Sequence, residues 1–347
     1  MAYKRQRYIF SLFALILFAF SNYCEAGENS GLIILSNDKI EVGILPEIGG
    51  RIVLLRKPGF NNILKSDERF WNNPEKQKPE ISAFSEFVAV GGHITWVGPQ
   101  KEWWIHQNLN ENRRKERANW PPDPYLIFGK NEIISKSHNS VKMMGPESPV
   151  SGVRLLKEIS IDDEGIVTVK TTAENIRDEI VQWDLWMLTR LDGFAKAFVP
   201  IEENGILELL ISETATTEPT PYKVEDKYFT FYPSVPVEPK KEQVQEAHLN
   251  ASEGYIAGFS EEQMLLIKFE KLDKDLIHSS HGLVELYNSI NETGDERLLE
   301  LEVHGAYKIL SPGETMSLTE TWELAAYQDK NNAADQIKFL NNFLLKR

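Results

Sequence analysis

The chain has 347 residues, of which 41% are hydrophobic, and a formal net charge of −14 at pH 7. A chain of this size can bury a large core, either in one big domain or in two modest ones. Its negative charge argues against nucleic acid and anionic membrane as partners, because both repel an acidic protein.

The first residues have the pattern of a secretory signal peptide. Three basic residues precede an apolar run over residues 8–20, and small residues stand at positions −3 and −1 of a cleavage site after Ala26. We therefore predict a signal peptide over residues 1–26. Two alternatives remain: lipid modification of Cys24, and an uncleaved anchor, for which the run falls short of the roughly 20 residues of a spanning helix.

Cleavage would change both the charge and the chemistry of the chain. It removes three basic residues and one acidic residue, so the formal net charge goes from −14 to −16. It also removes Cys24, the only cysteine, so the mature chain cannot form disulfides and depends on its core for stability. This favours a bacterial protein that is periplasmic or secreted and does not insert into the membrane after cleavage.

Alternating apolar residues then predict a series of strands. Residues 32–45 form a hairpin around a turn at Asn37 and Asp38, and residues 153–161 and 166–172 form a second hairpin. Further strands are predicted over residues 180–188, 206–211, 228–232, 264–269, 298–304 and 316–324. Strands at this spacing indicate an all-β sandwich, and residues 28–347 are predicted to be a single domain.

Two other segments depart from this pattern. Residues 88–104 contain three glycines, a proline and three tryptophans, which predict a bent, aromatic-lined surface and neither a regular strand nor a helix. Near the end, Asn332 can cap a helix whose apolar face carries Ile337, Leu340 and Leu344. We expect this short C-terminal helix to pack on the sandwich.

Several motifs resemble those of galactose mutarotase-like proteins. The matching segments are residues 41–55, 61–65, 91–99, 299–305, 310–314 and 320–324. Residues 91–93, together with the Trp-Pro-Pro-Asp-Pro run at 120–124, are also similar to a family of uncharacterised bacterial domains of the same fold. The resemblance implies a galactose mutarotase-like β-supersandwich with a sugar-binding concavity on one sheet.

The resemblance also implies a pair of proton-transfer groups. Mutarotases open and reclose a pyranose ring with an acid, usually a histidine, and a glutamate that takes the proton of the anomeric hydroxyl. Glu302 is the candidate for the base, and Glu285 is a close rival. The family's histidine is missing from the matching segment, residues 181–189. His93 or His106 could supply the acid instead, and Asp184 could take a polar recognition role.

The aromatic segment supplies the candidate binding residues. Gly92 would let the backbone turn closely under a ligand, and Trp96, Trp103 and Trp104 would offer flat apolar faces to a sugar ring. The alternative is that these tryptophans only cover one end of the sandwich.

Two functions follow, both with a carbohydrate as the ligand. The first is carbohydrate recognition without catalysis, and the second is a carbohydrate-active enzyme: an epimerase, mutarotase or lyase. His278 and His281 have the spacing of a metal-binding pair, but no third ligand is evident in the sequence, so neither a metal nor a cofactor is expected. The oligomeric state stays open.

Overall fold

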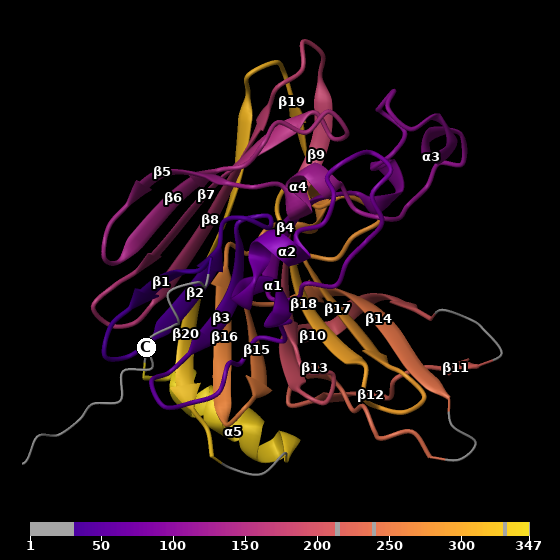
Figure 1. Ribbon diagram of the computed structural model, residues 1–347. Helices are drawn as coiled ribbons and strands as arrows, with labels where there is room; N and C mark the ends of the chain where they lie inside the picture. Colours follow the sequence, from indigo (N-terminus) through magenta and orange to yellow (C-terminus); the bar gives the residue numbers. More distant parts are fainter. Residues whose placement is uncertain (1–30, 212–215, 238–240, 329–331, 347) are drawn as a thin grey trace, which may run out of the picture.

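Two large antiparallel sheets pack against each other in the computed structural model, which describes residues 31–211, 216–237, 241–328 and 332–346 (Figure 1). The first sheet contains, in spatial order, β1 (Ile33–Ser36), β2 (Glu41–Leu45), β3 (Arg51–Arg56), β4 (His93–Gly98), β9 (Val181–Leu191), β18 (Arg297–His304), β17 (Val284–Ile290), β14 (Glu242–Ala251) and the second half of β10 (Lys196–Leu210).

The second sheet is built in the same antiparallel way. It contains β5 (Glu132–Lys136), β6 (Ser140–Met144), β7 (Val153–Ile161), β8 (Val167–Asn175), β20 (Thr315–Ala326), β16 (Gln263–Phe269), β15 (Tyr255–Ser260) and the first residues of β10. Strand β10 therefore belongs to both sheets, and it joins their edges.

The remaining strands extend these two sheets. The hairpin of β12 (Tyr222–Glu225) and β13 (Tyr228–Phe231) pairs with the middle of β10, and β11 (Thr217–Glu218) runs parallel to β14. The short β19 (Lys308–Leu310) pairs with the start of β9.

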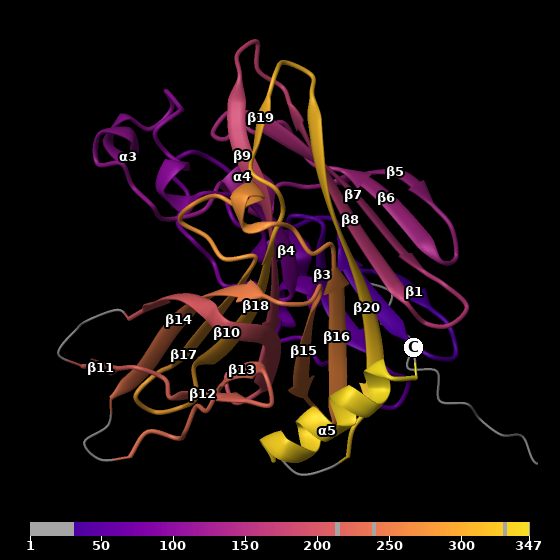
Figure 2. The same ribbon diagram turned by 180° about the vertical axis from the view of Figure 1, so that it is seen from behind.

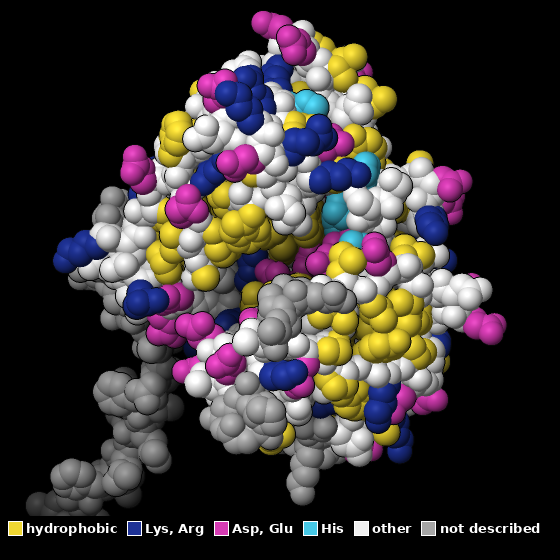
Figure 3. All heavy atoms as spheres, turned by 90° about the vertical axis from the view of Figure 1, so that its right-hand side faces the viewer, with side chains coloured by type: hydrophobic (Ala, Val, Ile, Leu, Met, Phe, Trp, Pro, Cys, Tyr) yellow, Lys and Arg dark blue, Asp and Glu magenta, His cyan; other side chains and the backbone are white. Residues whose placement is uncertain are grey.

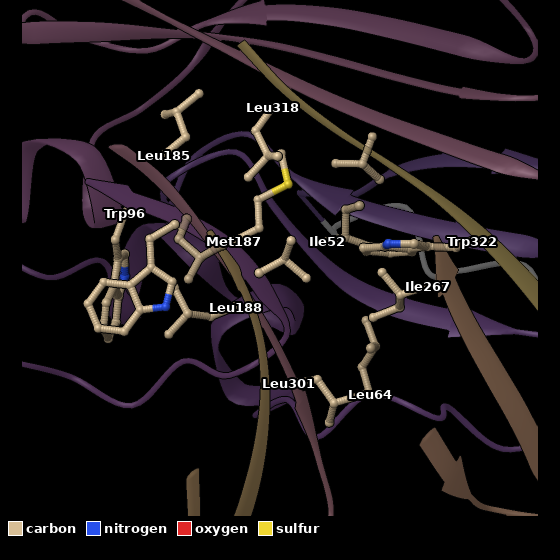
Figure 4. Close-up of a cluster of buried hydrophobic side chains, with 14 of the residues drawn as sticks. Ile52, Leu64, Trp96, Leu185, Met187, Leu188, Ile267, Leu301, Leu318 and Trp322 are labelled. Atoms are coloured by element: carbon tan, nitrogen blue, oxygen red, sulfur yellow. The ribbon is translucent and has the colours of Figure 1, made fainter. Parts of the chain in front are cut away.

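The core lies between the sheets, because period-two alternation gives each strand one inward face. Leu185 and Met187 of β9 and Leu301 of β18 meet Leu318 and Trp322 of β20 there (Figure 4). Polar contacts also cross the interface: the hydroxyl oxygens of Thr95 and Thr171 lie 2.9 Å apart. The sheets are thus held by a continuous apolar layer that contains a few satisfied polar groups.

Helices are short, with one exception. The segment between β3 and β5 contains α1 (Arg69–Asn72), α2 (Pro74–Gln77), α3 (Glu111–Lys115), α4 (Pro124–Phe128) and the 3-10 turn η1 (Gln100–Glu102), and η2 (Lys274–Leu276) follows β16. The longer α5 (Ala333–Leu344) lies across the lower ends of β16 and β20 (Figure 2). Its Ile337 and Leu340 join a second apolar cluster with Tyr255 and Phe259.

Most of the predicted elements are confirmed. Both hairpins form, with β1 paired to β2 and β7 to β8, and each of the other predicted strands overlaps an observed one. The Asn332 side chain accepts a hydrogen bond from the backbone of Ala334 and caps α5 as expected. No helix in the described part of the chain is long and apolar enough to cross a membrane.

One expectation about local structure is wrong. Residues 93–98, predicted to be irregular, form β4, and all six are buried. A strand covered on both faces has no polar alternation in its sequence, so the period-two signal is absent. The glycines end the strand instead of breaking it: Gly91 and Gly92, both with positive φ, precede β4, and Gly98 is its last residue.

A buried carboxyl group in the core gives a testable property of the fold. Glu320 of β20 is 1% exposed; its Oε2 accepts a 2.8 Å hydrogen bond from Trp322 Nε1, and its Oε1 has no hydrogen-bond partner in the part of the chain that the structure describes. Burial raises the pKa of Glu320 to about 7, against a smaller lowering by the Trp322 hydrogen bond. The folded protein therefore keeps a proton that the unfolded chain releases.

We predict that the free energy of unfolding falls, relative to Glu320→Gln, as the pH rises from 4.5 to above 7. The contribution of Glu320 is fully present below pH 4.5 and is lost as the pH rises through about 7, because only the folded state holds the proton in that interval. The difference should reach at most about 3 kcal/mol. Denaturant unfolding at pH 4.5, 6 and 8 measures it, and parallel pH profiles of the two proteins would contradict it.

Candidate functional site

Alternation in four neighbouring strands gathers polar side chains on the outer face of the first sheet. On β9 this face carries Asp184, Trp186 and Arg190, whereas Leu185 and Met187 point into the core. The neighbouring strands add further side chains to this face. Glu302 of β18 pairs with Leu188 of β9 on one side and with Glu285 of β17 on the other. We call this outer face the pocket face.

A pocket of about 900 Å³ opens on the pocket face. Three further segments complete it: residues 65–69, residues 87–91, and residues 295–298 at the start of β18. Figure 3 shows a hollow with hydrophobic side chains along one edge, acidic and basic side chains at its bottom, and histidines to one side. The wall thus combines apolar surface with charged groups.

Aromatic side chains form one side of the pocket. Trp96, Trp120, Trp186 and Phe87 all line it. The ring centroids of Trp96 and Trp186 lie 5.2 Å apart at an angle of 80°, and Phe87 lies 4.8 Å from Trp120. Trp120 is the accessible member at 46% exposure, whereas Trp96 and Trp186 are each 5% exposed.

Charged side chains lie beside this aromatic wall. Arg190 Nε lies 2.7 Å from Glu300 Oε1, and both side chains are largely buried. The guanidinium also lies over the ring of Trp96, 5.5 Å from its centroid. Arg190 Nη1 and Trp96 Nε1 have no hydrogen-bond partner within the described chain. Two residues of the pocket wall therefore carry donors that the protein itself leaves unpaired.

Glu302 lines the same pocket and is bound to one of the tryptophans. Its Oε2 accepts a 2.6 Å hydrogen bond from Trp186 Nε1, and the residue is 3% exposed. Burial raises the pKa of Glu302 well above its usual range, and the nearby carboxylates of Glu300, Glu285 and Glu246 raise it further.

Behind Trp186 lies a group of residues that we call the histidine–carboxylate cluster: Asp184, His281, Glu285 and His304. Asp184, Glu285 and His304 are buried, the His281 side chain is 6% exposed, and the rings of His281 and His304 stack with centroids 4.1 Å apart. The Trp186 ring lies 4.9 Å from that of His304, and a carboxylate oxygen of Glu302 in the pocket wall lies within 4.8 Å of ligand atoms of Glu285 and His304. None of the four is among the residues that line the pocket.

Opposite charges dominate inside the cluster. Burial alone would raise the pKa of Glu285, but His304 and His281 hold it below its usual range. Burial alone would lower the pKa of His304, but Glu285 and Asp184 raise it to about 10. The cluster therefore holds an imidazolium between two carboxylates when only protons are bound.

The structure brings two of the predicted site residues, Glu302 and Trp96, into the pocket. It places Asp184 and the rival base Glu285 close by, in the cluster. Gly92 lies just outside the pocket, where its positive φ serves backbone packing: a Cβ there would be 2.3 Å from the carbonyl oxygen of Ile52.

The two histidines proposed as the acid lie elsewhere. His93 is three residues from Trp96 on the same strand, so it points into the core, where its Nδ1 lies 3.0 Å from Thr189 Oγ1 and its ring contacts Trp322. Burial, with Lys157, Arg190 and Arg51 nearby, lowers the pKa of His93 well below its usual range. His106 is half-exposed beside Glu102, outside the pocket lining.

Trp103 and Trp104 also lie outside the pocket lining. Each is at most 1% exposed, and each indole nitrogen donates to a backbone carbonyl, that of Val97 at 2.5 Å and that of Pro121 at 2.7 Å. Their faces are covered by protein, as in the alternative that they close one end of the sandwich.

Several residues of the site were missed from the sequence, above all Trp186, Arg190, Glu300 and His304. One signal could have revealed part of them. On β18 the residues Glu300, Glu302 and His304 alternate with Leu299, Leu301 and Val303, which places three polar side chains on one face.

Comparison with known proteins agrees with this architecture. The family described as "Domain of unknown function (DUF4380)" matches residues 32–325. The chain belongs to this family. A search of curated proteins finds no match.

Solved structures resemble the chain at low sequence identity. The Slr1438 protein from Synechocystis sp. PCC 6803 is 11% identical with a TM-score of 0.51, and the match covers 85% of this chain and 96% of that one. A galactose mutarotase-like protein from Lactobacillus casei is 13% identical (TM-score 0.49, 85% and 100% covered), and a putative aldose 1-epimerase from Escherichia coli K12 is 11% identical (TM-score 0.48, 85% and 99% covered). The all-β sandwich with a short C-terminal helix, expected from the sequence, is confirmed.

Proposed function

We propose that this protein binds a carbohydrate in the pocket on the outer face of the first sheet. The observation that carries the proposal is the convergence of Trp96, Trp120 and Trp186 with Arg190 and Glu302 on one concave surface. Sugar rings present an apolar C–H face and a rim of hydroxyls, and they need both kinds of partner. The similarity of the fold to mutarotase-like proteins agrees with the proposal.

The charges of the wall favour a neutral or amino sugar. Eight carboxylate residues line the pocket against four basic ones, and the basic residues Arg190 and Arg297 are already paired with Glu300 and Asp192. A uronic acid or sugar phosphate would meet net negative charge there and would be repelled. The hydroxyls of a neutral sugar can instead donate to the free carboxylate oxygens.

Export from the cytoplasm is part of the proposal. Its support is the sequence of residues 1–26, which lie outside the described residues, together with the absence of cysteine from the rest of the chain. The glycan ligand would then be met in the periplasm or outside the cell.

We predict that the exported protein begins at Gly27 and carries no lipid. Intact-mass measurement of the protein, recovered from the periplasm or medium, checks this. A mass that corresponds to a diacylglycerol-modified Cys24, or to the uncleaved chain, would contradict it.

Trp120 offers the cleanest test of carbohydrate binding. A glycan array of neutral, amino and acidic sugars would first identify a ligand of the mature protein, and calorimetry would then measure its affinity. We predict that Trp120→Ala weakens binding of that ligand about tenfold or more, because a stacked ring contributes on the order of 1–3 kcal/mol.

A matched control is Phe84→Ala, since Phe84 is 68% exposed and does not line the pocket. It should leave the affinity unchanged. Carbohydrate binding in this pocket is contradicted if no glycan binds, or if Trp120→Ala binds as tightly as the control.

A second candidate function is proton transfer to or from the bound sugar, as in an epimerase, mutarotase or lyase. The position of Glu302 favours it, because this carboxyl lines the pocket and is fixed by its 2.6 Å hydrogen bond with Trp186. Neither His93 nor His106 lies among the pocket-lining residues, so the acid first proposed for this reaction is not supplied there.

Glu302→Gln distinguishes the two functions, because glutamine keeps the shape and the acceptor for Trp186 but cannot transfer the proton. For an enzyme we predict near-unchanged glycan affinity with at least a hundredfold loss of turnover. Proton NMR of the glycan in D2O follows anomer exchange and C–H exchange. If wild-type protein speeds neither, or if Glu302→Gln speeds them equally, Glu302 is not catalytic and recognition alone remains.

A further inference from the structure

Three buried side chains from distant parts of the sequence converge behind Trp186. Asp184 lies on β9, His304 lies on β18, and His281 belongs to the loop between β16 and β17. One ligand atom of each lies within 4.8 Å of the others. His278, which has the spacing of a metal-binding pair with His281 in the sequence, is not part of this group, because its Nδ1 contacts Ser280 Oγ at 2.7 Å. The neighbours of His281 in the group are His304 and Asp184.

The spacing fits the ligands of one small cation. Asp184 Oδ2 lies 3.4 Å from His304 Nδ1. Around a tetrahedral Zn²⁺ with bonds of about 2.0–2.1 Å, ligand atoms are separated by about 3.3 Å. Two histidines and one carboxylate are also a ligand set that Zn²⁺ accepts.

Glu285 orients both histidines toward Asp184. Its Oε1 lies 3.0 Å from His281 Nδ1, and its Oε2 lies 3.4 Å from His304 Nε2. The backbone N–H of Gly282 donates to the same carboxylate at 3.0 Å and fixes it. Metal-bound histidines commonly have a carboxylate at their second nitrogen, which sets the tautomer and the ring orientation. Here one carboxylate does this for two rings and leaves His281 Nε2 and His304 Nδ1 turned toward Asp184.

The atoms that face one another lack hydrogen bonds. Across the described residues, both carboxylate oxygens of Asp184, His281 Nε2 and both ring nitrogens of His304 have no hydrogen-bond partner. Asp184 and His304 are fully buried, and the His281 side chain is 6% exposed. Buried polar atoms are rarely left unpaired, because each then loses its hydrogen bonds to water without replacement. Such unpaired atoms on three side chains, with one ligand atom of each within 4.8 Å of the others, indicate a ligand that they share.

The backbone leaves room at this place. At Gly98, the end of β4, a Cβ would lie 2.4 Å from Asp184 Oδ1 and 3.1 Å from His281 Nε2. Any side chain there would collide with the atoms that face the centre of the cluster. A glycine at position 98 therefore leaves the ligand atoms in place, whereas a residue with a side chain would displace them.

We infer that Asp184, His281 and His304 form a binding site for a divalent metal ion of the Zn²⁺ class, with Glu285 as the residue that positions the two histidines. The metal would fasten the loop that carries His281 to strands β9 and β18. None of the three ligands lines the pocket, but a carboxylate oxygen of Glu302, in the pocket wall, lies within 4.8 Å of ligand atoms of Glu285 and His304, so the two sites are neighbours.

The test uses the mature protein after dialysis against a chelator. Calorimetric titration with Zn²⁺ should show one ion bound per chain, and Co²⁺ should give the visible absorption of a tetrahedral site. X-ray absorption at the zinc edge, which needs no variant, should show two imidazole ligands and at least one oxygen ligand at about 2.0–2.1 Å. A rise in melting temperature with Zn²⁺ is also expected, because only the folded chain presents the site.

Variants then assign the ligands. Asp184→Asn and His304→Gln should each weaken Zn²⁺ binding at least a hundredfold, Glu285→Gln about 10- to 100-fold, and Gly98→Ala should weaken it as well. His278→Ala is the matched control and should bind as the wild type does; circular dichroism confirms that each variant is folded.

The inference is overturned if the wild-type protein binds no Zn²⁺ stoichiometrically, or if X-ray absorption shows no imidazole ligand. It is equally overturned if folded Asp184→Asn and His304→Gln retain wild-type affinity, or if His278→Ala removes the site. In the first case the cluster holds a proton on His304 between the two carboxylates and no metal. Glycan binding by the wild-type protein, measured with and without Zn²⁺ on the same preparations, tests the carbohydrate proposal separately.

Discussion

The indole of Trp186 is the contact on which the arrangement of the pocket face depends. Its Nε1 holds Glu302 in the pocket wall at 2.6 Å, while its ring contacts Trp96 at 5.2 Å and His304 at 4.9 Å. It can do this because β9 is an interior strand of the first sheet, with β4 on one side and β18 on the other. Without this ring, Glu302 would lose its hydrogen-bond donor, and Trp96 and His304 would lose their common ring contact.

The pairing of β17 with β18 brings two carboxyl groups close together, and Trp186 and the histidines compensate for their repulsion. Glu285 and Glu302 are direct cross-strand neighbours, and like charges in that position destabilise a sheet. The two carboxyl groups have different partners. Glu285 faces His281 and His304, whereas Glu302 accepts from a neutral indole and has its pKa raised by burial and by the surrounding carboxylates. One strand pair thus presents one carboxyl to the pocket and another to the cluster.

The strand pattern, the capped C-terminal helix and the family resemblance could be predicted from the sequence, because each depends on local periodicity or a short motif. The sequence could not predict which side chains of β4 and β9 point into the core and which point into the pocket. Both strands are buried on two sides, so His93, pointing into the core, and Trp96, pointing into the pocket, carry no polarity signal that separates them. The cluster was also hidden, since Asp184, His281 and His304 meet only through the pairing register. Glu302 was found because the family motif places it.

The crystal structure of the mature protein with a bound glycan tests the central claim most directly. Our account predicts sugar density in the pocket, with a ring face on Trp120 and hydroxyls within hydrogen-bonding distance of Glu302 and the Arg190–Glu300 pair. A glycan bound on any other surface, with the space beside Trp186 filled only by water, would contradict the assignment of the pocket face as the carbohydrate site.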